Sequence, residues 1–461
     1  MRKRLFFIGI GGYGMSAIAR LMNEMGYSVS GSDQKLSPLA LDLRKAGINV
    51  YEGHHADHLV GIDIVIRSSA IPDDNPEVSA AHALGIAVLK RADFLGEVMQ
   101  KYIGIAVAGT HGKTTTTAMI AWILSGMDQD PSYIIGGVSK NLGTNAHAGQ
   151  GKYFVIEADE YDRMFLGLKP QIAVITNSEH DHPDCYPTPL DYQQAFLAFA
   201  RKINPQGFLV ICGDDEGNQA IIKQLSGINV ITYGFGTHNN FQSRDLIINS
   251  SGCYHFSFVQ KNSGTENLVV EVDLSIPGKH NVLNATAALA VAQRSDMDLN
   301  RCARLLHQFS GTGRRFDLYS ETNGITLIDD YAHHPTEIIT TLEAAKSRYP
   351  NRNLWVVWQP HTFSRSIALI DRFAKSFEQA DHIIVTPIFA SREKNSDFTS
   401  VDIVTRINHR DIRTFASHAE ISHYLINHLQ TGDVLLVLSA GDADEINPEV
   451  ARGLLKKEGA Q

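Results

Sequence analysis

Residues Ile103–Thr115 read IGIAVAGTHGKTT, and this stretch decides the fold class. Its first six residues are small and apolar, which predicts a buried β-strand, and a helix is expected to begin after the last glycine. A strand, a glycine-rich turn and a helix in this order are typical of a parallel α/β sheet, with the turn at the carboxyl end of its strand.

The turn in this stretch has the residues of a phosphate-binding loop. Its glycines let backbone N–H groups surround phosphate oxygens, Lys113 supplies an ammonium group, and Thr114 supplies a hydroxyl for Mg²⁺. The loop departs from the general pattern because Val107 stands where the first glycine belongs. A purely structural turn is the alternative. It is disfavoured because a lysine at the start of a helix opposes the helix dipole unless an anion is bound.

Similar patterns on both sides of this stretch predict an α/β fold with three domains, residues 1–100, 101–312 and 313–461. The first and third are expected to be Rossmann-like, and the central one is expected to resemble a P-loop ATPase with an added antiparallel sheet. That sheet is expected between Leu246 and Ile276, before a helix from about Asn281 to Arg294, and the hinge into the third domain at Gly311–Gly313. The strands are expected at Leu5–Ile10, Ser28–Ser32, Ile64–Arg67, Ile86–Leu89, Ile103–Ala108, Tyr153–Glu157, Ile172–Thr176, Phe208–Cys212, Gly324–Ile328, Leu354–Trp358, His382–Thr386 and Val434–Leu438.

Composition and charge exclude several classes of protein. Hydrophobic residues make up 43% and charged residues 20% of the 461 residues, which argues against disorder. A net charge of −9 without a long Lys/Arg run argues against a nucleic-acid partner. No stretch approaches the roughly 18–20 apolar residues of a membrane-spanning helix, and the four cysteines are far apart, as expected in a reducing compartment. The sequence predicts a cytoplasmic monomer or homodimer without a membrane partner.

A second glycine-rich turn, Gly9–Gly14, follows the first expected strand and precedes a helix expected at Met15–Met25. A GxGxxG turn of this kind holds a pyrophosphate at the N-terminus of the helix, and Asp33 follows at the distance where such folds contact a ribose. The turn also interrupts the apolar run after Met1, which excludes a signal peptide. Nucleotide or diphosphate binding is the main interpretation, and a turn that serves packing alone is the alternative.

Two polar clusters follow later strands of the central domain. Glu157–Asp162 contains four carboxylates, which suit Mg²⁺ coordination near a phosphate loop, although a solvated acidic loop is the alternative. Asn177–Asp184 contains two histidines and three carboxylates, which suit zinc or a magnesium ion at a phosphoryl-transfer site. Three histidines outside such clusters are interpreted as surface residues: His54, His55 and His58.

The third domain carries cationic and polar residues near its expected strand ends. They are Arg314–Phe316 after the hinge, Asp329–Pro335 and Gln359–His361. Groups of this kind on a separate domain can close over the phosphates held by a neighbouring domain and expel water.

These motifs, in this order, resemble those of the Mur ligases, which build the peptide of bacterial peptidoglycan precursors. The most specific match is Gly109–Thr116, the family's own phosphate loop, which also accounts for Val107. The resemblance covers essentially the whole chain. The other matching segments are Glu157–Glu160, Gly278–Ala285, Gly313–Phe316 and Asp330–Pro335.

The resemblance implies an ATP-dependent ligase that uses Mg²⁺ in cell-wall synthesis. Gly9–Ser16 and Ser68–Ile71 are most similar to the class that joins L-alanine to the lactyl carboxylate of UDP-N-acetylmuramate, so the first domain is expected to bind a UDP-sugar. In this class the carboxylate attacks the γ-phosphate of ATP, and the amine of L-alanine displaces phosphate from the acyl phosphate. A neutral histidine is expected to accept the proton of the amine, and the sequence leaves open which one.

The resemblance also implies roles for individual residues. The UDP-sugar is expected to contact Gly9, Gly11, Gly12, Tyr13, Gly14, Met15, Ser16, Asp33, Ser68 and Ser69. ATP is expected to contact Gly109, Thr110, His111, Gly112, Lys113, Thr114 and Thr115, with His280, Asn281 and Asn284 around adenine, Asp330 at the ribose and Arg315 at the γ-phosphate. The amino acid is expected to contact Tyr331, His333, His361 and Arg365. Mg²⁺ is expected at Thr114 and Glu157, with a second ion at His182, and the catalytic residues are expected to be Lys113, Glu157, His182, Arg315 and His333.

The acceptor is the main alternative within the family. Phe196 stands where later-acting members place a lysine that carries a carbamate, which leaves the alanine-adding class and a class that recycles a tripeptide. Tyr161 is similar to the recycling class, but Phe165–Pro170 lacks the longer insertion of that class and favours L-alanine. Thr362 stands where some relatives have an arginine, which bears on the charge of the site.

Two alternatives lie outside the family. An NAD-dependent oxidoreductase would use the Gly9–Gly14 turn but leaves Lys113 unexplained. A nucleotide-binding regulator without turnover would not need the near-complete set of phosphate and metal groups.

Overall fold

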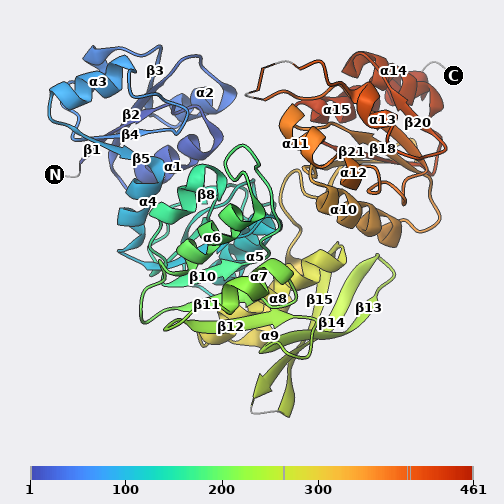
Figure 1. Cartoon of the computed structure of the whole chain (residues 1–461), viewed down its shortest axis with the longest axis horizontal. Coiled ribbons are helices and arrows are strands. Elements are labelled where there is room, and N and C mark those ends of the chain that lie inside the picture. The colour runs from blue at the N-terminus through green and yellow to red at the C-terminus, as the bar shows by residue number, and fades with distance from the viewer. Residues whose placement is uncertain (1–2, 263–264, 392, 395, 459–461) are drawn as a thin grey trace. The chain divides into compact units, whose positions relative to one another are not determined.

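The computed structural model describes residues 3–262, 265–391, 393–394 and 396–458 as an α/β chain with three sheets (Figure 1). The chain divides into two compact units, and each is described by itself. The first comprises residues 1–179, 189–242 and 286–305, and the second comprises residues 180–188, 243–285 and 306–461.

The N-terminal sheet has five parallel strands in the order β3-β2-β1-β4-β5, which is the order of a Rossmann fold. The expected strands are confirmed, although Gly9 ends β1 earlier than expected and β3, with only Val50 buried, was not predicted. The strands are β1 Arg4–Ile8, β2 Ser28–Asp33, β3 Asn49–Glu52, β4 Ile64–Arg67 and β5 Ala87–Lys90. The helices are α1 Tyr13–Glu24, α2 Pro38–Lys45, η1 Ala56–Leu59, α3 Pro76–Ala83 and α4 Arg91–Met99.

The central sheet has ten strands in the order β15-β14-β13-β12-β11-β10-β6-β9-β7-β8. Its middle strands are parallel, and β14 and β15 form the antiparallel pair expected from the alternating sequence. The strands are β6 Ile103–Ala108, β7 Ser132–Ile134, β8 Ala146–His147, β9 Tyr153–Glu157, β10 Ile172–Ile175, β11 Phe208–Cys212, β12 Asn229–Gly234, β13 Phe241–Ile248, β14 Cys253–Asn262 and β15 Thr265–Pro277. The helices are α5 Lys113–Gly126, η2 Tyr161–Gly167, α6 Pro189–Ala200, α7 Glu216–Ile222, α8 Lys279–Arg294 and α9 Leu299–Gln308.

The C-terminal sheet has six strands in the order β16-β17-β21-β18-β19-β20, all parallel except the edge strand β16. One apolar cluster on this sheet includes Trp358, and another includes Trp355. The strands are β16 Asp317–Thr322, β17 Ile325–Asp330, β18 Leu354–Trp358, β19 His382–Val385, β20 Ile412–Thr414 and β21 Val434–Leu438. The helices are α10 Pro335–Arg348, α11 Phe363–Ala368, α12 Ile370–Phe373, α13 Ser400–Val404, α14 His418–His428, η3 Ala443–Glu445 and α15 Ile446–Glu458.

The three tryptophans of the chain lie in the central and C-terminal parts. Trp122 on α5 donates its Nε1–H to the carbonyl oxygen of Leu305, 2.7 Å away. Trp355 donates to Asp433 and stacks on His382 at 3.8 Å between ring centroids, whereas Trp358 is fully buried.

The interpretation of the N-terminal histidines as surface residues is wrong for His54 and His58. The carboxylate of Glu77 is fully buried, and both imidazoles contact it through Nδ1, at 3.0 Å from His54 and 2.7 Å from His58. The hydroxyl of Ser32 also donates to Glu77, at 2.6 Å. A buried carboxylate requires such donors, which draw the two histidines inward, while His55 stays exposed.

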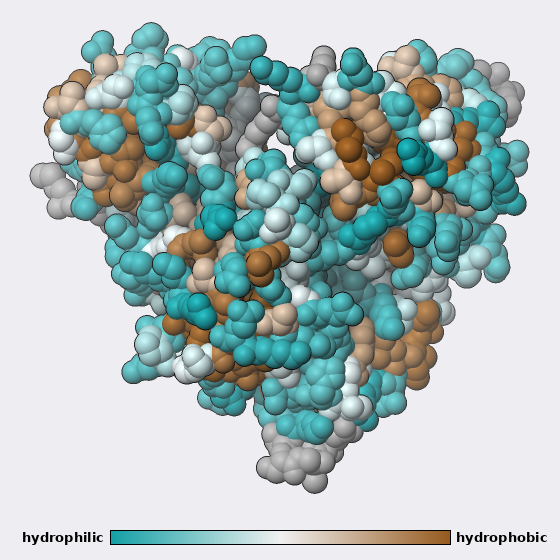
Figure 2. Space-filling model, viewed as in Figure 1, coloured by the Kyte–Doolittle hydropathy of each residue, from teal (hydrophilic) through white to brown (hydrophobic). Residues whose placement is uncertain are grey.

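Hydrophilic residues cover most of the face that Figure 2 shows, and the apolar side chains on it lie in separate patches. None of the helices in the described ranges is both long and apolar enough to cross a membrane.

Candidate active site

The phosphate loop needs its glycines for steric reasons. Gly109 has φ +143°, and a side chain there would bring Cβ into the hydroxyl oxygen of Thr176, the residue that follows β10. Gly112 has φ +79° and is the N-cap of α5, so the left-handed backbone that starts the helix favours glycine. The strand, turn and helix expected from the sequence are confirmed.

Lys113 lies over this loop and is held by oxygen atoms. Its Nζ donates to the carbonyl oxygens of Gly109 and Thr110 at 2.6 and 3.1 Å and pairs with Glu160 at 2.8 Å. Burial alone would lower the pKa of Lys113, but the carboxylates of Glu160 and Glu157 outweigh burial and raise it. The lysine therefore keeps its charge, and Glu160, one residue of the acidic cluster, is its partner.

The two predicted ligands of the first Mg²⁺ lie together in the first unit. The hydroxyl of Thr114 donates to Glu157 Oε1 at 3.1 Å, and the amide of Gly136 donates to Glu157 Oε2 at 2.7 Å. Hydroxyl and carboxylate oxygens are the hard ligands that Mg²⁺ prefers, so this donor pair fits the ion. His182 belongs to the second unit.

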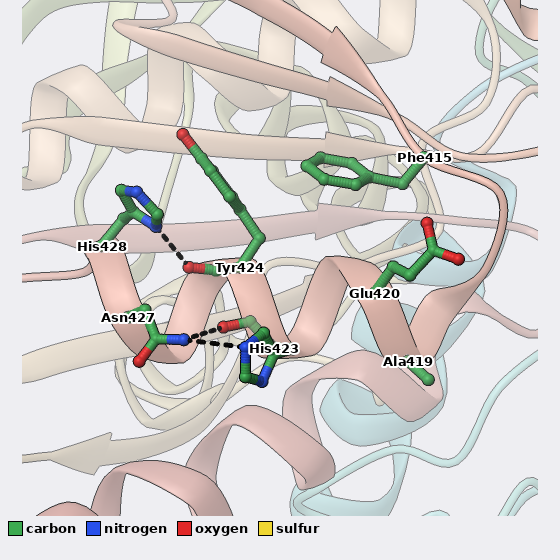
Figure 3. A pocket seen from close by; sticks show the side chains of 7 residues that line it. All are labelled: Phe415, Ala419, Glu420, His423, Tyr424, Asn427 and His428. Atoms are coloured by element: carbon green, nitrogen blue, oxygen red, sulfur yellow. Dashed lines mark hydrogen bonds between the residues drawn. The ribbon is translucent and has the colours of Figure 1, made fainter.

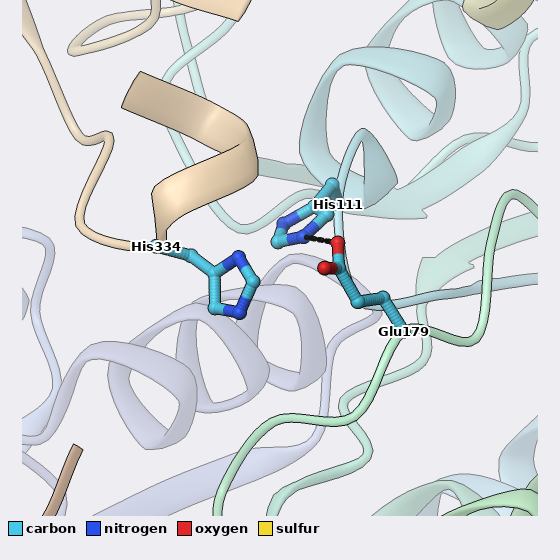
Figure 4. Close-up of side chains that lie close together, drawn as sticks. All are labelled: His111, Glu179 and His334. Carbon is cyan, nitrogen blue, oxygen red and sulfur yellow. Dashed lines mark hydrogen bonds and ion pairs between the residues drawn. The ribbon is translucent and has the colours of Figure 1, made fainter. Parts of the chain in front are cut away.

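Part of the histidine–carboxylate cluster supports the phosphate loop. The amide of His111 donates to Asn177 Oδ1 at 2.9 Å, and His111 Nε2 lies 3.1 Å from Glu179 Oε2 (Figure 4). The hydroxyl of Thr110 donates to the carbonyl oxygen of Glu179 at 2.6 Å. β10 pairs with β6, so residues after both strands meet at one edge of the sheet. The sequence placed Asn177 and Glu179 in a possible metal site and did not predict this support.

The N-terminal glycine turn contacts Asp33 and Ser68, two residues that were predicted to lie in the same site. Gly11 donates its N–H to Asp33 Oδ2 at 2.8 Å, so Asp33 holds the turn. Gly9 has φ +79° and packs against Ser68, while Ser16 is buried in α1. Tyr13, Gly14 and Met15 begin α1 after Gly12, its N-cap, and Ser69 is exposed.

Arg91 at the start of α4 lies against this turn, and the sequence did not predict this contact. Its Nη1 occupies the place where a side chain on Gly14 would lie, 2.0 Å from the position of a Cβ. The guanidinium also pairs with Asp159 at 3.5 Å. The only signal in the sequence is that Arg91 begins a helix directly after β5, where a parallel strand ends.

In the second unit, Arg365 forms a buried ion pair with Asp181. Arg365 Nε donates to Asp181 Oδ1 at 2.9 Å and Nη2 donates to Oδ2 at 3.2 Å, and both side chains are 5% exposed. Burial alone would raise the pKa of Asp181, but Arg365 outweighs it and holds that pKa well below its usual range. Nη2 also lies 3.4 Å from His182 Nδ1. Sequence spacing gives no sign of this pair, which joins residues 184 positions apart.

Two predicted amino-acid-binding histidines lie next to each other in the same unit. The ring centroids of His333 and His361 are 5.6 Å apart, and the ring of Tyr331 lies edge-on to His333 at 5.4 Å. Burial lowers the pKa of His333 to about 3 and that of His361 to about 4, with the charge of Arg365 acting in the same direction on both. The structure thus brings together all four predicted amino-acid residues.

Glu337 at the start of α10 contacts both His333 and Arg315, a role that the sequence did not predict. Its carboxylate lies 3.4 Å from His333 Nδ1 and 3.6 Å from Arg315 Nη1, and it accepts the backbone N–H of His333 at 3.1 Å. Arg315 also lies over the ring of Tyr331, 5.0 Å from its centroid. The sequence contains a signal for the position of Glu337. A glutamate at the third position of a helix that begins with proline is a capping-box residue.

Asp330 is buried, and its carboxylate accepts hydrogen bonds from the backbone of two segments. Its oxygens accept N–H bonds from Phe316 at 2.6 Å and from Ala332 at 2.7 Å. Burial raises the pKa of Asp330 to about 6, against the opposing effect of Arg315. Asp329 beside it pairs with Arg314 at 3.3 Å, and burial raises its pKa to about 7.

The residues predicted around adenine begin α8. Asn281 donates its side-chain amide to the carbonyl oxygen of Pro277 at 2.7 Å, and Asn284 donates to Asn281 Oδ1 at 3.0 Å. Both asparagines are buried, and His280 is partly exposed beside Gly278. The three residues form one short segment, as their spacing predicts.

A surface pocket lies elsewhere, on α14 and the end of β20 (Figure 3). Its rings include Phe415 and Tyr424, with centroids 5.2 Å apart, and His428, which stacks on Tyr424 at 3.9 Å. None of the predicted site residues lines this pocket, so the candidate active site is better defined by the loops and ion pairs above.

Three family models match consecutive parts of the chain. The Mur ligase family catalytic domain matches residues 4–103, the Mur ligase middle domain matches 107–292, and the Mur ligase glutamate ligase domain matches 314–441.

Individual relatives are similar over the full length. A UDP-N-acetylmuramate–L-alanine ligase from Caldanaerobacter subterraneus subsp. tengcongensis is 41% identical over 96% of each chain, and one from Nitratidesulfovibrio vulgaris is 40% identical over 98% of this chain and 99% of its own. A crystal structure of a UDP-N-acetylmuramate–alanine ligase from Thermotoga maritima superposes with a TM-score of 0.81 at 28% identity over 100% of both chains. A murein peptide ligase from Psychrobacter arcticus gives a TM-score of 0.70 at 27% identity over 98% of both chains.

Proposed function

The chain belongs to the Mur ligase family, and from this premise we propose that it joins L-alanine to the lactyl carboxylate of UDP-N-acetylmuramate at the expense of ATP. The observation that carries the proposal is identity of 41% over 96% of both chains to a relative with this name. The phosphate loop supports it, since Lys113 is charged and lies over a turn built for phosphate oxygens.

The reaction has two steps. The lactyl carboxylate attacks the γ-phosphate of ATP and gives an acyl phosphate and ADP, and the amine of L-alanine then attacks the acyl carbon and releases phosphate. Lys113 holds the β- and γ-phosphates, and Arg315 offsets charge that develops on the transferred group. His280, Asn281 and Asn284 hold the adenine, and Asp330 lies at the ribose.

Mg²⁺ supplies charge neutralisation for the carboxylate that approaches the triphosphate. Thr114 and Glu157 are its proposed ligands, supported by their adjacent oxygen atoms. His182 is the proposed ligand of a second ion.

The N-terminal turn is the proposed UDP-sugar site. Its support is the Rossmann order of the sheet and the connected set of Gly9, Gly11, Asp33 and Ser68 at one edge of it. We further propose domain boundaries at residues 100 and 312, a cytoplasmic location where ATP is available, and a monomer or homodimer.

The test is phosphate release from ATP and Mg²⁺ with UDP-N-acetylmuramate and one acceptor at a time. The acceptors are L-alanine, L-serine, glycine and the tripeptide L-Ala-γ-D-Glu-meso-diaminopimelate. Release that depends on L-alanine, with the ligated product identified by mass spectrometry, is the expected result. Absence of phosphate release with every acceptor would contradict the proposal.

The recycling ligase is the second candidate, favoured by Tyr161 and by the likeness to a murein peptide ligase. Release with the tripeptide alone would establish it. Phe196 does not separate the two candidates, because neither class is expected to have the carbamate-bearing lysine at this position. Its side chain is fully buried and packs edge-on against Phe165 at 5.2 Å.

A further inference from the structure

The adjacent imidazoles of His333 and His361 differ at Nε2, which is a hydrogen-bond acceptor in His333 and a donor in His361. The neighbours of each Nδ1 determine this difference. A neutral imidazole carries a proton on one ring nitrogen and a lone pair on the other. Which nitrogen carries the proton is set by the hydrogen bond that the other nitrogen makes.

At His361 the deciding neighbour is Arg365. Its Nη1 lies 3.0 Å from His361 Nδ1, and a guanidinium has only donors, so Nδ1 must accept. The proton of the neutral ring is therefore on Nε2, which can only donate. Arg365 is fixed in this role by its two hydrogen bonds to Asp181.

At His333 the deciding neighbours are acceptors. Nδ1 lies 2.9 Å from the carbonyl oxygen of Tyr331 and 3.4 Å from the carboxylate of Glu337, neither of which can donate. Nδ1 therefore carries the proton, and Nε2 keeps its lone pair. Within the described part of the chain, no hydrogen-bond donor contacts this Nε2.

Both rings are neutral near pH 7, because burial and the charge of Arg365 lower both pKa values, while Glu337 opposes this at His333 and Asp181 opposes it at both rings. A neutral acceptor and a neutral donor side by side complement an α-amino acid, which presents an N–H group and a carboxylate on one carbon.

We propose that His333 is the base for the attacking amine of L-alanine and that His361 donates through Nε2–H to its carboxylate, with Arg365 and Asp181 as positioning residues. This assignment rests on the proposed function. The amine lone pair forms the bond to the acyl carbon, and the C–O bond to phosphate breaks with its electron pair on the departing phosphate. The N–H proton, made acidic by the new N–C bond, passes to His333 Nε2 and then to water or phosphate.

The first test separates the two steps in His333→Gln, which keeps much of the size of histidine but cannot take a proton. Hydroxylamine in place of L-alanine traps the acyl phosphate as a hydroxamate, and amide formation with L-alanine is measured on the same preparations. We expect hydroxamate formation close to that of the unmodified protein and amide formation about 100-fold slower or more. Retained hydroxamate formation also shows that the variant is folded.

The second test uses His361. At this position glutamine is expected to preserve the proposed role, whereas at His333 it removes it. The side-chain amide nitrogen of glutamine can replace a donor at the Nε2 position, whereas alanine cannot. We expect His361→Ala to raise the KM for L-alanine about 10- to 100-fold, with a smaller effect on kcat, and His361→Gln to recover most of this loss.

Three results would overturn the assignment, and two of them concern the amide-forming step. One is undiminished amide formation by His333→Gln, and the other is loss of kcat rather than a raised KM on substitution of His361. Loss of hydroxamate formation in a folded His333→Gln would also overturn it, because the role would then not be confined to the amine. Failure of the proposed function is distinct, since the unmodified protein would then form no hydroxamate from UDP-N-acetylmuramate and ATP.

Discussion

The positive charge of Lys113 is balanced by a carboxylate and by carbonyl oxygens of the protein. Its ammonium group contacts Glu160 and two carbonyl oxygens of the phosphate loop. A triphosphate would compete for this ammonium group with Glu160, which is 2% exposed at the side chain and has little access to water. The contacts of Lys113 thus lie within the central sheet's own loops.

We predict that Lys113→Ala lowers turnover about 100- to 1,000-fold or more, because the developing charge on the transferred phosphate loses its cation. Binding of UDP-N-acetylmuramate, measured by calorimetry, should change by about twofold or less, as expected for independent sites. Lys101→Ala, at an exposed lysine before β6, is the control. Comparable loss of UDP-sugar binding in the Lys113 variant would contradict two separate sites.

Asp329 makes stability depend on pH. Its folded-state pKa of about 7 lies above the ordinary 3.8, so the folded protein holds this proton more tightly than the unfolded chain does. The stabilisation is present below the unfolded pKa and is lost as pH rises toward 7.

We predict that Asp329→Asn, which does not titrate, gains stability relative to the unmodified protein between pH 5 and pH 8. The relative gain should be at least about 1 kcal/mol, since one pKa unit corresponds to about 1.4 kcal/mol. Thermal unfolding midpoints at both pH values measure it. A difference that shrinks as pH rises would refute the assigned direction.

The short helix α11 is held by an unusual N-cap. Thr362 has φ +65°, a backbone region that β-branched residues rarely adopt, and its hydroxyl accepts the N–H of Arg365 at 3.4 Å. Its own N–H donates to the carbonyl oxygen of Phe389 at 2.9 Å. The threonine that the sequence analysis associated with the charge of the site therefore positions the helix that carries Arg365.

We predict that Thr362→Val lowers stability by about 0.5–1 kcal/mol, because the cap is lost while the size and branching of the side chain remain. The KM for L-alanine should rise more than the KM for ATP, because α11 carries Arg365. Thr362→Ser keeps the hydroxyl and is the matched control. Equal KM values in the two variants would show that the cap does not position Arg365.

Elements with a strong local signal could be predicted from the sequence. β6, β9, β11, β18 and β21 have the predicted bounds, because each is an apolar run that ends at a turn. β7 and β8 were missed because they are only three and two residues long. β3 was missed because Val50 is its only buried residue and it gives no apolar run. The edge strand β16 was missed because most of its residues are not buried and give no apolar run.

For the candidate site, too, local sequence signals could be interpreted and long-range contacts could not. The turn geometry at Gly109, Gly112 and Lys113 could be predicted because one local motif contains all three residues. Asp181, Glu337 and Arg91 could not be assigned their partners, because those contacts depend on tertiary packing. His54 and His58 were misinterpreted because the carboxylate that binds them, Glu77, lies 19 or more positions away.

The C-terminal sheet has its own core. Among the residues that the structure describes, both apolar clusters on it consist of residues between Phe316 and Leu454. This arrangement is typical of an independently stable domain.

We predict that residues 313–461 alone fold and unfold in one cooperative thermal transition, followed by circular dichroism. The isolated fragment should have no ligase activity, because the phosphate loop is absent. A broad, non-cooperative melt would contradict both the self-contained core and the proposed boundary at residue 312.

The positions of the three tryptophans make fluorescence a selective reporter. Trp122 reports on the α5 side of the central sheet, and Trp355 and Trp358 report on the C-terminal sheet, while the N-terminal sheet emits only through its tyrosines. Unfolding of the N-terminal sheet by itself should leave tryptophan emission unchanged. With Trp122→Phe, the remaining emission comes from Trp355 and Trp358 and follows the C-terminal sheet alone.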